Sequence, residues 1–93
     1  MTWKVVEVID GDTFRVSPQW KWKEESGDRI RPTGYDVPEE GQPGHDEARE
    51  KLKRIVSDKE VELKNPVDID RGRLVCDVFV DGKNLASFFP EYQ

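Results

Sequence analysis

Only one segment of this 93-residue chain has the periodicity of an amphipathic α-helix, and segments with strand character lie on both sides of it. Between residues 46 and 56 the apolar side chains share one helical face; they are Ala48, Leu52, Ile55 and Val56, at positions i, i+4, i+7 and i+8. No other segment predicts a helix of this length, so strands have to form most of the fold.

Three strands are predicted before the helix. They span residues 3–9, 13–16 and 29–36. The first two are joined by a tight turn at Asp10-Gly11-Asp12 and form a hairpin. A polar insertion with a turn at Ser26-Gly27-Asp28 separates the second strand from the third. Pro32 weakens the third strand, because proline offers no N–H group to a sheet.

Two further strands, at residues 61–64 and 74–80, are predicted after the helix because apolar and polar side chains alternate there. Glycine and proline predict a loop at residues 37–44. The remaining predicted connections are a loop at 65–72, a turn at Asp81-Gly82 and a short helical turn at 85–89.

Three strands, a helix and two strands form the element order of a five-stranded oligonucleotide/oligosaccharide-binding (OB) barrel. We therefore predict a single α+β domain over residues 1–93. It is a β-barrel with one main helix between strands three and four and a short helical turn at the C-terminus. Closing the sheet removes strand edges and lets a small core suffice, which suits a chain with 34% hydrophobic residues.

Charge is unevenly distributed along the chain. The net charge is -5, and residues 1–47 hold 11 acidic but only 6 basic side chains, whereas residues 48–93 hold 9 of each. This balance disfavours a basic nucleic-acid coat or a polybasic membrane patch, and the acidic first half favours a bound cation. The single cysteine, Cys76, allows neither an intrachain disulfide nor a thiolate metal cage.

No apolar run approaches the roughly 18 residues that cross a bilayer, and the N-terminus lacks the apolar core of a secretory signal. We therefore expect a cytoplasmic protein without a membrane partner. A leader that has been removed is compatible with this expectation.

Four carboxylates lie beside two predicted turns. Asp10 and Asp12 flank the first hairpin turn, and Asp36 and Glu39 follow the third strand. Hard cations such as Ca²⁺ take about six to eight oxygen ligands, which include backbone carbonyls and water, so few side chains are needed. Each motif alone is ordinary, since Asp-Gly is common in hairpin turns and Asp is common before a proline-containing loop.

Two arginines, Arg31 and Arg73, strengthen the case for a site. A guanidinium matches two phosphate oxygens, so arginines beside a cation site indicate phosphoryl-transfer chemistry. The five-residue spacing of Arg31 and Asp36 points to opposite faces of a regular strand, but Pro32 and Gly34 argue against regularity there. The alternative is that both arginines form loose surface ion pairs, which composition alone favours.

In their order and spacing, these motifs resemble the staphylococcal nuclease (thermonuclease) family. The similar segments are Ile9-Asp10-Gly11-Asp12-Thr13-Phe14, Ile30-Arg31, Asp36-Val37-Pro38-Glu39, Gly72-Arg73-Leu74 and Val80-Asp81-Gly82-Lys83-Asn84-Leu85. The resemblance covers residues 5 to about 89. It implies the five-stranded OB barrel, with an α-helix between strands three and four.

The resemblance also implies a calcium site. Asp12, Asp36 and the backbone carbonyl of Val37 would ligate Ca²⁺. Val37 stands where the family usually has threonine, a change that a backbone ligand tolerates.

The resemblance further implies three catalytic residues. Glu39 would orient or deprotonate the attacking water, and Arg31 and Arg73 would hold the phosphate. The implied reaction is in-line attack of water on a DNA or RNA phosphodiester, with cleavage of the P–O5′ bond to leave a 3′-phosphate. His45, the only histidine, is assigned no catalytic role.

The chain departs from the family pattern in several places. Asp70-Arg71-Gly72-Arg73 lacks the family's tyrosine beside the nucleotide pocket, so a shortened turn is expected there. Pro32 replaces an aliphatic strand residue. The chain stops at Gln93, before the family's last helix, and is acidic where efficient nucleases are basic. These departures concern substrate affinity more than the chemistry.

Substrate contacts are expected from Arg71 and from Trp20-Lys21-Trp22-Lys23, where rings for base stacking alternate with lysines. This pattern suits single-stranded DNA or RNA. The alternative is a hairpin extension in which Trp20 and Trp22 share one face and cover the barrel. Phe88 and Phe89 are expected either to dock on the barrel or to cover a partner, which would be a second copy or a larger parent protein.

The first hypothesis is therefore an active calcium-dependent nuclease, because all five matched polar positions carry the family's residue type. The rival hypothesis is a module of the same fold that binds nucleic acid or protein with weak or no catalytic activity. A purely structural or protein-interaction role is the third.

Overall fold

The computed structural model describes residues 1–93. Its strands are β1 (Trp3–Asp10), β2 (Thr13–Trp22), β3 (Glu25–Pro32), β4 (Glu60–Asp70), β5 (Arg73–Val80) and the short β6 (Lys83–Asn84). One α-helix, α1 (His45–Val56), lies between β3 and β4 in sequence, and two 3₁₀ turns, η1 (Leu85–Phe88) and η2 (Pro90–Tyr92), follow β6.

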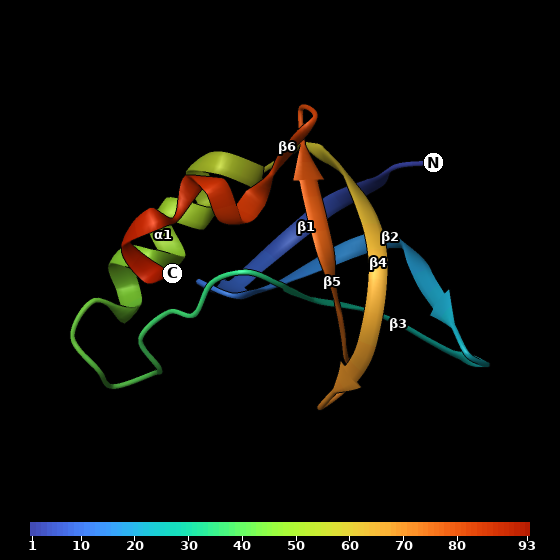
Figure 1. Ribbon diagram of the computed structural model, residues 1–93, viewed down its shortest axis with the longest axis horizontal. Coiled ribbons are helices and arrows are strands. Elements are labelled where there is room, and N and C mark those ends of the chain that lie inside the picture. Colours follow the sequence, from blue (N-terminus) through green and yellow to red (C-terminus); the bar gives the residue numbers. More distant parts are fainter.

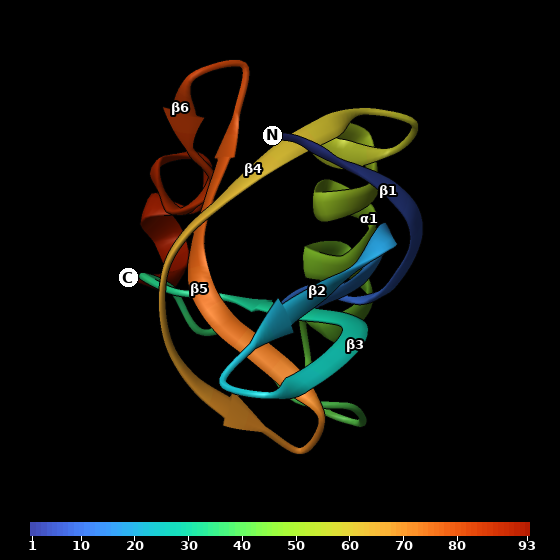
Figure 2. The same cartoon turned by 90° about the vertical axis from the view of Figure 1, so that its right-hand side faces the viewer.

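The five long strands close into a barrel. Antiparallel pairs join them in the order β3-β2-β1-β4-β5, and β3 then pairs with β5 in parallel, with Ile30 opposite Leu74. Figure 1 shows α1 on one side of the barrel, and Figure 2 shows the strands curving around a common interior. The predicted fold class is confirmed: this is a closed, mixed five-stranded barrel with one helix between β3 and β4, compatible with an OB-like fold.

The apolar face of α1 covers the barrel as its periodicity predicts. Ala48, Leu52 and Val56 are buried, and the helix packs mainly on β1. Gly44 precedes the helix with a φ of 90°, in the left-handed region that glycine favours. Acidic side chains in the first turn and basic side chains in the last turn complement the helix macrodipole.

The core draws apolar side chains from every long strand. Val5 of β1, Phe14 of β2, Ile30 of β3, Val61 of β4 and Val78 of β5 are each at most 3% exposed. The thiol of Cys76 is buried among them, and burial raises its pKa to about 12, with a smaller contribution from the charge of Asp77. Cys76 therefore packs as an apolar residue and stays protonated.

The turn between β2 and β3 differs from the prediction. It lies at Lys23 and Glu24, whose φ angles are 49° and 68°, and the predicted polar insertion consists of the ends of two long strands. Gly27 lies within β3, opposite Trp20. A Cβ atom on Gly27 would lie 2.8 Å from Trp20 Cζ2, so this glycine is needed for the close approach of the indole ring and not for a turn.

The third strand ends earlier than predicted. β3 stops at Pro32 rather than at residue 36, because Gly34 has a φ of 96° and turns the chain out of the sheet. Pro32 itself is fully buried opposite Cys76 of β5.

The fourth strand is longer than predicted. β4 continues to Asp70, and its register against β5 is irregular between Lys64 and Asp68. This irregularity breaks the alternation on which the prediction relied. The predicted loop is reduced to a two-residue turn at Arg71 and Gly72, which agrees with the expected shortening.

The C-terminal turns dock on the barrel beside Tyr35. Phe89 is fully buried, and its ring stacks on that of Tyr35 with centroids 4.3 Å apart and planes inclined by 4°. Phe88 is partly buried against the same core. Of the two expectations for these rings, docking on the barrel holds for Phe89, which has no surface left for a partner. None of the helices, of which α1 is the longest at 12 residues, has the length and apolarity to cross a membrane.

Candidate active-site cleft

Three connections that are distant in sequence enclose a polar cleft of about 350 Å³. They are the β1–β2 turn, the loop between β3 and α1, and the β4–β5 turn. The residues lining the cleft are Asp10, Asp12, Val37, Pro38, Glu39, Glu40, His45, Arg71 and Arg73. The two motifs on hairpin turns and the proline-containing loop thus meet in one place.

Gly11 allows the first of these turns to approach the helix and the loop. A Cβ atom on Gly11 would lie 2.8 Å from the Cβ of Ala48 and 3.2 Å from Cγ1 of Val37. The buried hydroxyl of Tyr35 donates a hydrogen bond of 2.9 Å to the Gly11 carbonyl. The turn that carries Asp10 and Asp12 is therefore fixed against both neighbours.

Arg31 bridges two of the candidate carboxylates. Its Nη2 lies 2.5 Å from Asp36 Oδ1, and its Nε lies 3.6 Å from Asp12 Oδ2. The odd spacing of Arg31 and Asp36 is no obstacle, because β3 ends at Pro32 and the two residues do not share a strand. The Arg31 side chain is only 20% exposed, which distinguishes it from a loose surface arginine.

Arg73 approaches Asp12 from the opposite hairpin. Its Nη1 donates to Thr13 Oγ1 at 2.8 Å and lies 3.7 Å from Asp12 Oδ1. Its Nη2 donates to Asp70 Oδ2 at 2.6 Å. With 17% of its side chain exposed, Arg73 is held in a defined orientation at the cleft.

Asp12 and Asp10 form a pair of interacting carboxyl groups. Burial raises the pKa of Asp12 to about 6, the hydrogen bond with Asp10 and the charge of Asp10 add to this increase, and the charge of Arg31 opposes it. Burial also raises the pKa of Asp10, but hydrogen bonds with the side chain and amide of Asp12 and with Thr13 lower it overall. Of the two carboxyl groups, Asp12 is therefore the one that takes up a proton more readily.

Glu39 presents its carboxylate from a loop held by its own hydrogen bonds. The Glu39 amide donates to Gln42 Oε1 at 2.8 Å, and the Gln42 amide donates to the Glu39 carbonyl at 2.9 Å. Nδ1 of His45 lies 3.1 Å from the Pro38 carbonyl oxygen. The Glu39 carboxylate is exposed to the cleft and forms no ion pair within the chain.

The oxygen donors at the cleft match a hard cation in their chemistry. Asp10 and Asp12 line it directly, and Val37 is a further lining residue. Asp36 is 87% exposed and lies outside the lining, bound to Arg31. No group of three or more His, Cys, Asp or Glu side chains converges as a ready-made metal site. The donor set therefore fits Ca²⁺ only with carbonyl and water ligands completing it.

The residues predicted to contact substrate lie in three different places. Arg71 lines the cleft and is 88% exposed. Trp20 is a core residue, 2% exposed, whose indole N–H donates to the Arg29 carbonyl at 2.9 Å, so it has no free face for a base. Lys21, Trp22 and Lys23 lie at the tip of the β2–β3 hairpin and not at the cleft.

Some contacts at the cleft are not indicated by the sequence. Asp10 is one of the four carboxylates that the sequence offers to a cation, and it lines the cleft although the family resemblance gives it no role. Gln42 and His45 fix the loop before Glu39, and no local pattern signals such contacts.

No family model matches the chain, and a search of curated proteins finds no match. The barrel fold is established by the strand pairing, and the chemistry has to be inferred from the cleft.

Proposed function

We propose that this protein is a calcium-dependent nuclease that hydrolyses phosphodiester bonds of DNA or RNA and leaves 3′-phosphate products. The observation that carries the proposal is the position of Asp12 between two well-ordered guanidinium groups, 3.6 Å from Arg31 and 3.7 Å from Arg73, in a cleft that Glu39 also lines. This arrangement puts positive charge and a free carboxylate on one small polar surface.

Arg31 and Arg73 would hold the phosphate and stabilise the charge that develops on it. Guanidinium groups bind two phosphate oxygens at once, and donors that are already oriented act more strongly in the transition state than mobile ones. Arg31 is neutralised by Asp36 in the absence of substrate, so a phosphate would compete with that carboxylate. Arg73 is oriented in the same manner by Asp70 and Thr13.

Glu39 would serve as the general base. It would take a proton from a water molecule as the water oxygen bonds to phosphorus, and the P–O5′ bond would break, with a proton passing to the leaving O5′ atom. The absence of an ion pair at Glu39 leaves its carboxylate available for this proton transfer. Gln42 and His45 would keep the loop in position.

Asp12, Asp36 and the Val37 carbonyl would hold the calcium ion, and Asp36 would have to leave Arg31 to do so. Asp10 lines the cleft with Asp12 and is an additional oxygen donor. When bound, calcium would reduce the negative charge on the phosphate. Burial and the charge of Asp10 raise the pKa of Asp12, and a cation bound beside Asp12 would stabilise its charged form.

A second candidate is a module that binds nucleic acid or protein without significant catalysis. It is favoured by two observations: Asp36 is bound to Arg31, and no three acidic side chains converge on a metal position. The net charge of -5 is also unfavourable for tight phosphate binding.

Incubation of a labelled single-stranded oligonucleotide with the protein, in calcium or in chelator, separates the two candidates. The nuclease proposal predicts cleavage in calcium and none in chelator. A mobility shift without cleavage in either buffer would identify the binding module. If the protein neither cleaves nor shifts the oligonucleotide, both candidates are contradicted.

A further inference from the structure

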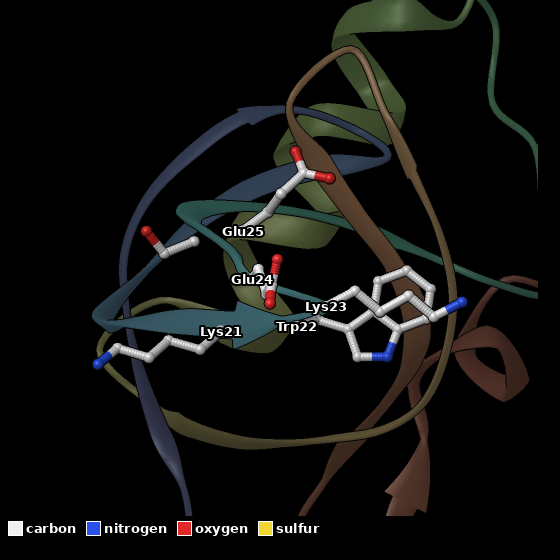
Figure 3. A pocket seen from close by; sticks show the side chains of 6 residues that line it. Lys21, Trp22, Lys23, Glu24 and Glu25 are labelled. Atoms are coloured by element: carbon white, nitrogen blue, oxygen red, sulfur yellow. The ribbon is translucent and has the colours of Figure 1, made fainter.

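The end of the β2–β3 hairpin carries aromatic and positively charged side chains at a distance from the cleft. In Figure 3, the Lys23 side chain lies across the Trp22 indole, Lys21 points the other way, and the Glu25 carboxylate points away from the ring. The Lys23 ammonium is 4.7 Å from the Trp22 ring centroid. Neither Lys21 nor Lys23 forms an ion pair, although Glu24 and Glu25 border the same space, and Lys23 is the lysine that lies over the aromatic ring.

Below Trp22 there is an apolar cavity of about 90 Å³ between the hairpin and β4. Its walls include Trp3, Trp22, Leu63 and Pro66. Trp22 thus forms a boundary between this cavity and the open hairpin tip, and Lys21 borders both spaces.

One of the residues that line the cavity, Trp3, has an unpartnered hydrogen-bond donor. The indole Nε1 of Trp3 is buried and has no acceptor, whereas the indole of the neighbouring Trp20 donates to a backbone carbonyl. Buried donors are almost always paired in folded proteins. A water molecule would be poorly held here, because it needs about two to four polar partners and most of the lining is apolar.

We propose that this end of the hairpin binds one unpaired nucleotide of a single-stranded nucleic acid. The base would contact the Trp22 ring and accept a hydrogen bond from Trp3 Nε1 through a carbonyl oxygen. The adjoining phosphate would form an ion pair with the Lys23 ammonium, which would then leave its position over the ring. This proposal rests on the proposed function, because it names the substrate class as single-stranded. A base in a duplex has both faces stacked and its pairing edge occupied, so it cannot make these contacts.

Binding without cleavage tests the site directly. The probes are a short fluorescein-labelled oligothymidylate and the same strand in a duplex, measured by fluorescence anisotropy in chelator. Trp22→Leu keeps an apolar wall but removes the ring, and is expected to weaken single-strand binding about 5- to 150-fold, the range for one stacked base. Trp3→Phe keeps a ring but removes the donor and is expected to weaken it less.

Charge is tested in parallel. Lys23→Gln is expected to weaken binding and to reduce the slope of log K against log salt by about 0.7, the value for one phosphate contact on a single strand. Lys83→Gln on β6 is the matched control and should bind like the unaltered protein, since that lysine is exposed and lies on another element. Thermal melting of each variant checks that the barrel is intact.

Several outcomes would overturn the site. They are equal binding of duplex and single strand, unchanged affinity of both folded Trp22→Leu and Lys23→Gln, or no binding of the unaltered protein. Size-exclusion evidence of a dimer that Trp22→Leu dissociates would assign the surface to a second copy and would also overturn it. If the protein binds the single strand through Trp22 but does not cleave it in calcium, the binding site is supported and only the nuclease proposal is contradicted.

Discussion

Arg73 and Asp12 belong to different hairpins, yet Arg73 Nη1 lies 3.7 Å from Asp12 Oδ1. The same guanidinium also bonds to Thr13 and Asp70, so it ties the β4–β5 turn to the β1–β2 turn. Both side chains are less than 20% exposed, at 17% and 19%. A substitution of either residue is therefore expected to change the positions of both turns at the cleft.

Arg73→Lys is expected to slow cleavage of single-stranded DNA by about 10²- to 10³-fold, the usual effect of losing one oriented transition-state donor. Lysine keeps a positive charge but not the planar fork that binds two phosphate oxygens. Single-turnover rates with calcium measure the effect. Arg54→Lys is the control, since Arg54 is exposed on α1 and outside the cleft. An unaltered rate for Arg73→Lys would exclude Arg73 from phosphate binding.

Asp12→Asn is expected to stabilise the calcium-free protein at neutral pH. The pKa of Asp12 is raised from 3.8 to about 6, so its charged form is disfavoured in the folded state. Ionisation of Asp12 therefore lowers the free energy of unfolding. This loss is absent below about pH 4, grows as the pH rises towards the pKa of the folded state, and reaches about 2–3 kcal/mol above that pKa. Urea unfolding in chelator should show the variant's advantage appearing between these limits. A difference that does not vary with pH would contradict the raised pKa.

Gln42→Ala is expected to lower kcat about fivefold, with KM little changed, because the variant loses one hydrogen bond that orients the Glu39 loop. Gln42→Glu retains an acceptor oxygen for the Glu39 amide and should recover most of the rate. Steady-state kinetics on a single-stranded oligonucleotide provide both constants. Equal activity of Gln42→Ala and the unaltered protein would show that the loop does not need this contact.

Gly27→Ala is expected to destabilise the barrel by about 1–3 kcal/mol, since the new methyl group would overlap the Trp20 ring. Chemical denaturation followed by tryptophan fluorescence measures the loss. Ser26→Ala is the matched control, because Ser26 is exposed on the same strand. Equal stability of the two variants would be inconsistent with the close packing of Gly27 and Trp20.

The sequence predicts the order of elements correctly because each depends on a local period. The stripe of α1 and the alternation in β5 can be read from neighbouring residues. The position of the β2–β3 turn cannot, because Gly27 is required by a ring seven residues earlier in the chain and only resembles a turn residue. The extent of β4 is likewise hidden by its irregular register against β5.

The candidate cleft is only partly predictable from sequence. The motifs identify Asp12, Arg31, Glu39 and Arg73, which the barrel brings to one end. The pairing of Asp36 with Arg31 and the interaction of Asp10 with Asp12 depend on distances that only the folded chain defines. For Trp20 the prediction of a substrate contact is wrong. The Trp-Lys pattern is typical of a binding surface, but the Trp20 ring lies in the core.

The most direct test of the nuclease proposal is single-turnover cleavage of a 5′-labelled single strand by the unaltered protein and by Glu39→Gln, in calcium. The proposal predicts rapid cleavage by the unaltered protein to fragments whose mobility changes on treatment with a 3′-phosphatase, and a large loss of rate in the variant. Cleavage that Glu39→Gln leaves unchanged, or fragments that carry a 3′-hydroxyl, would contradict it.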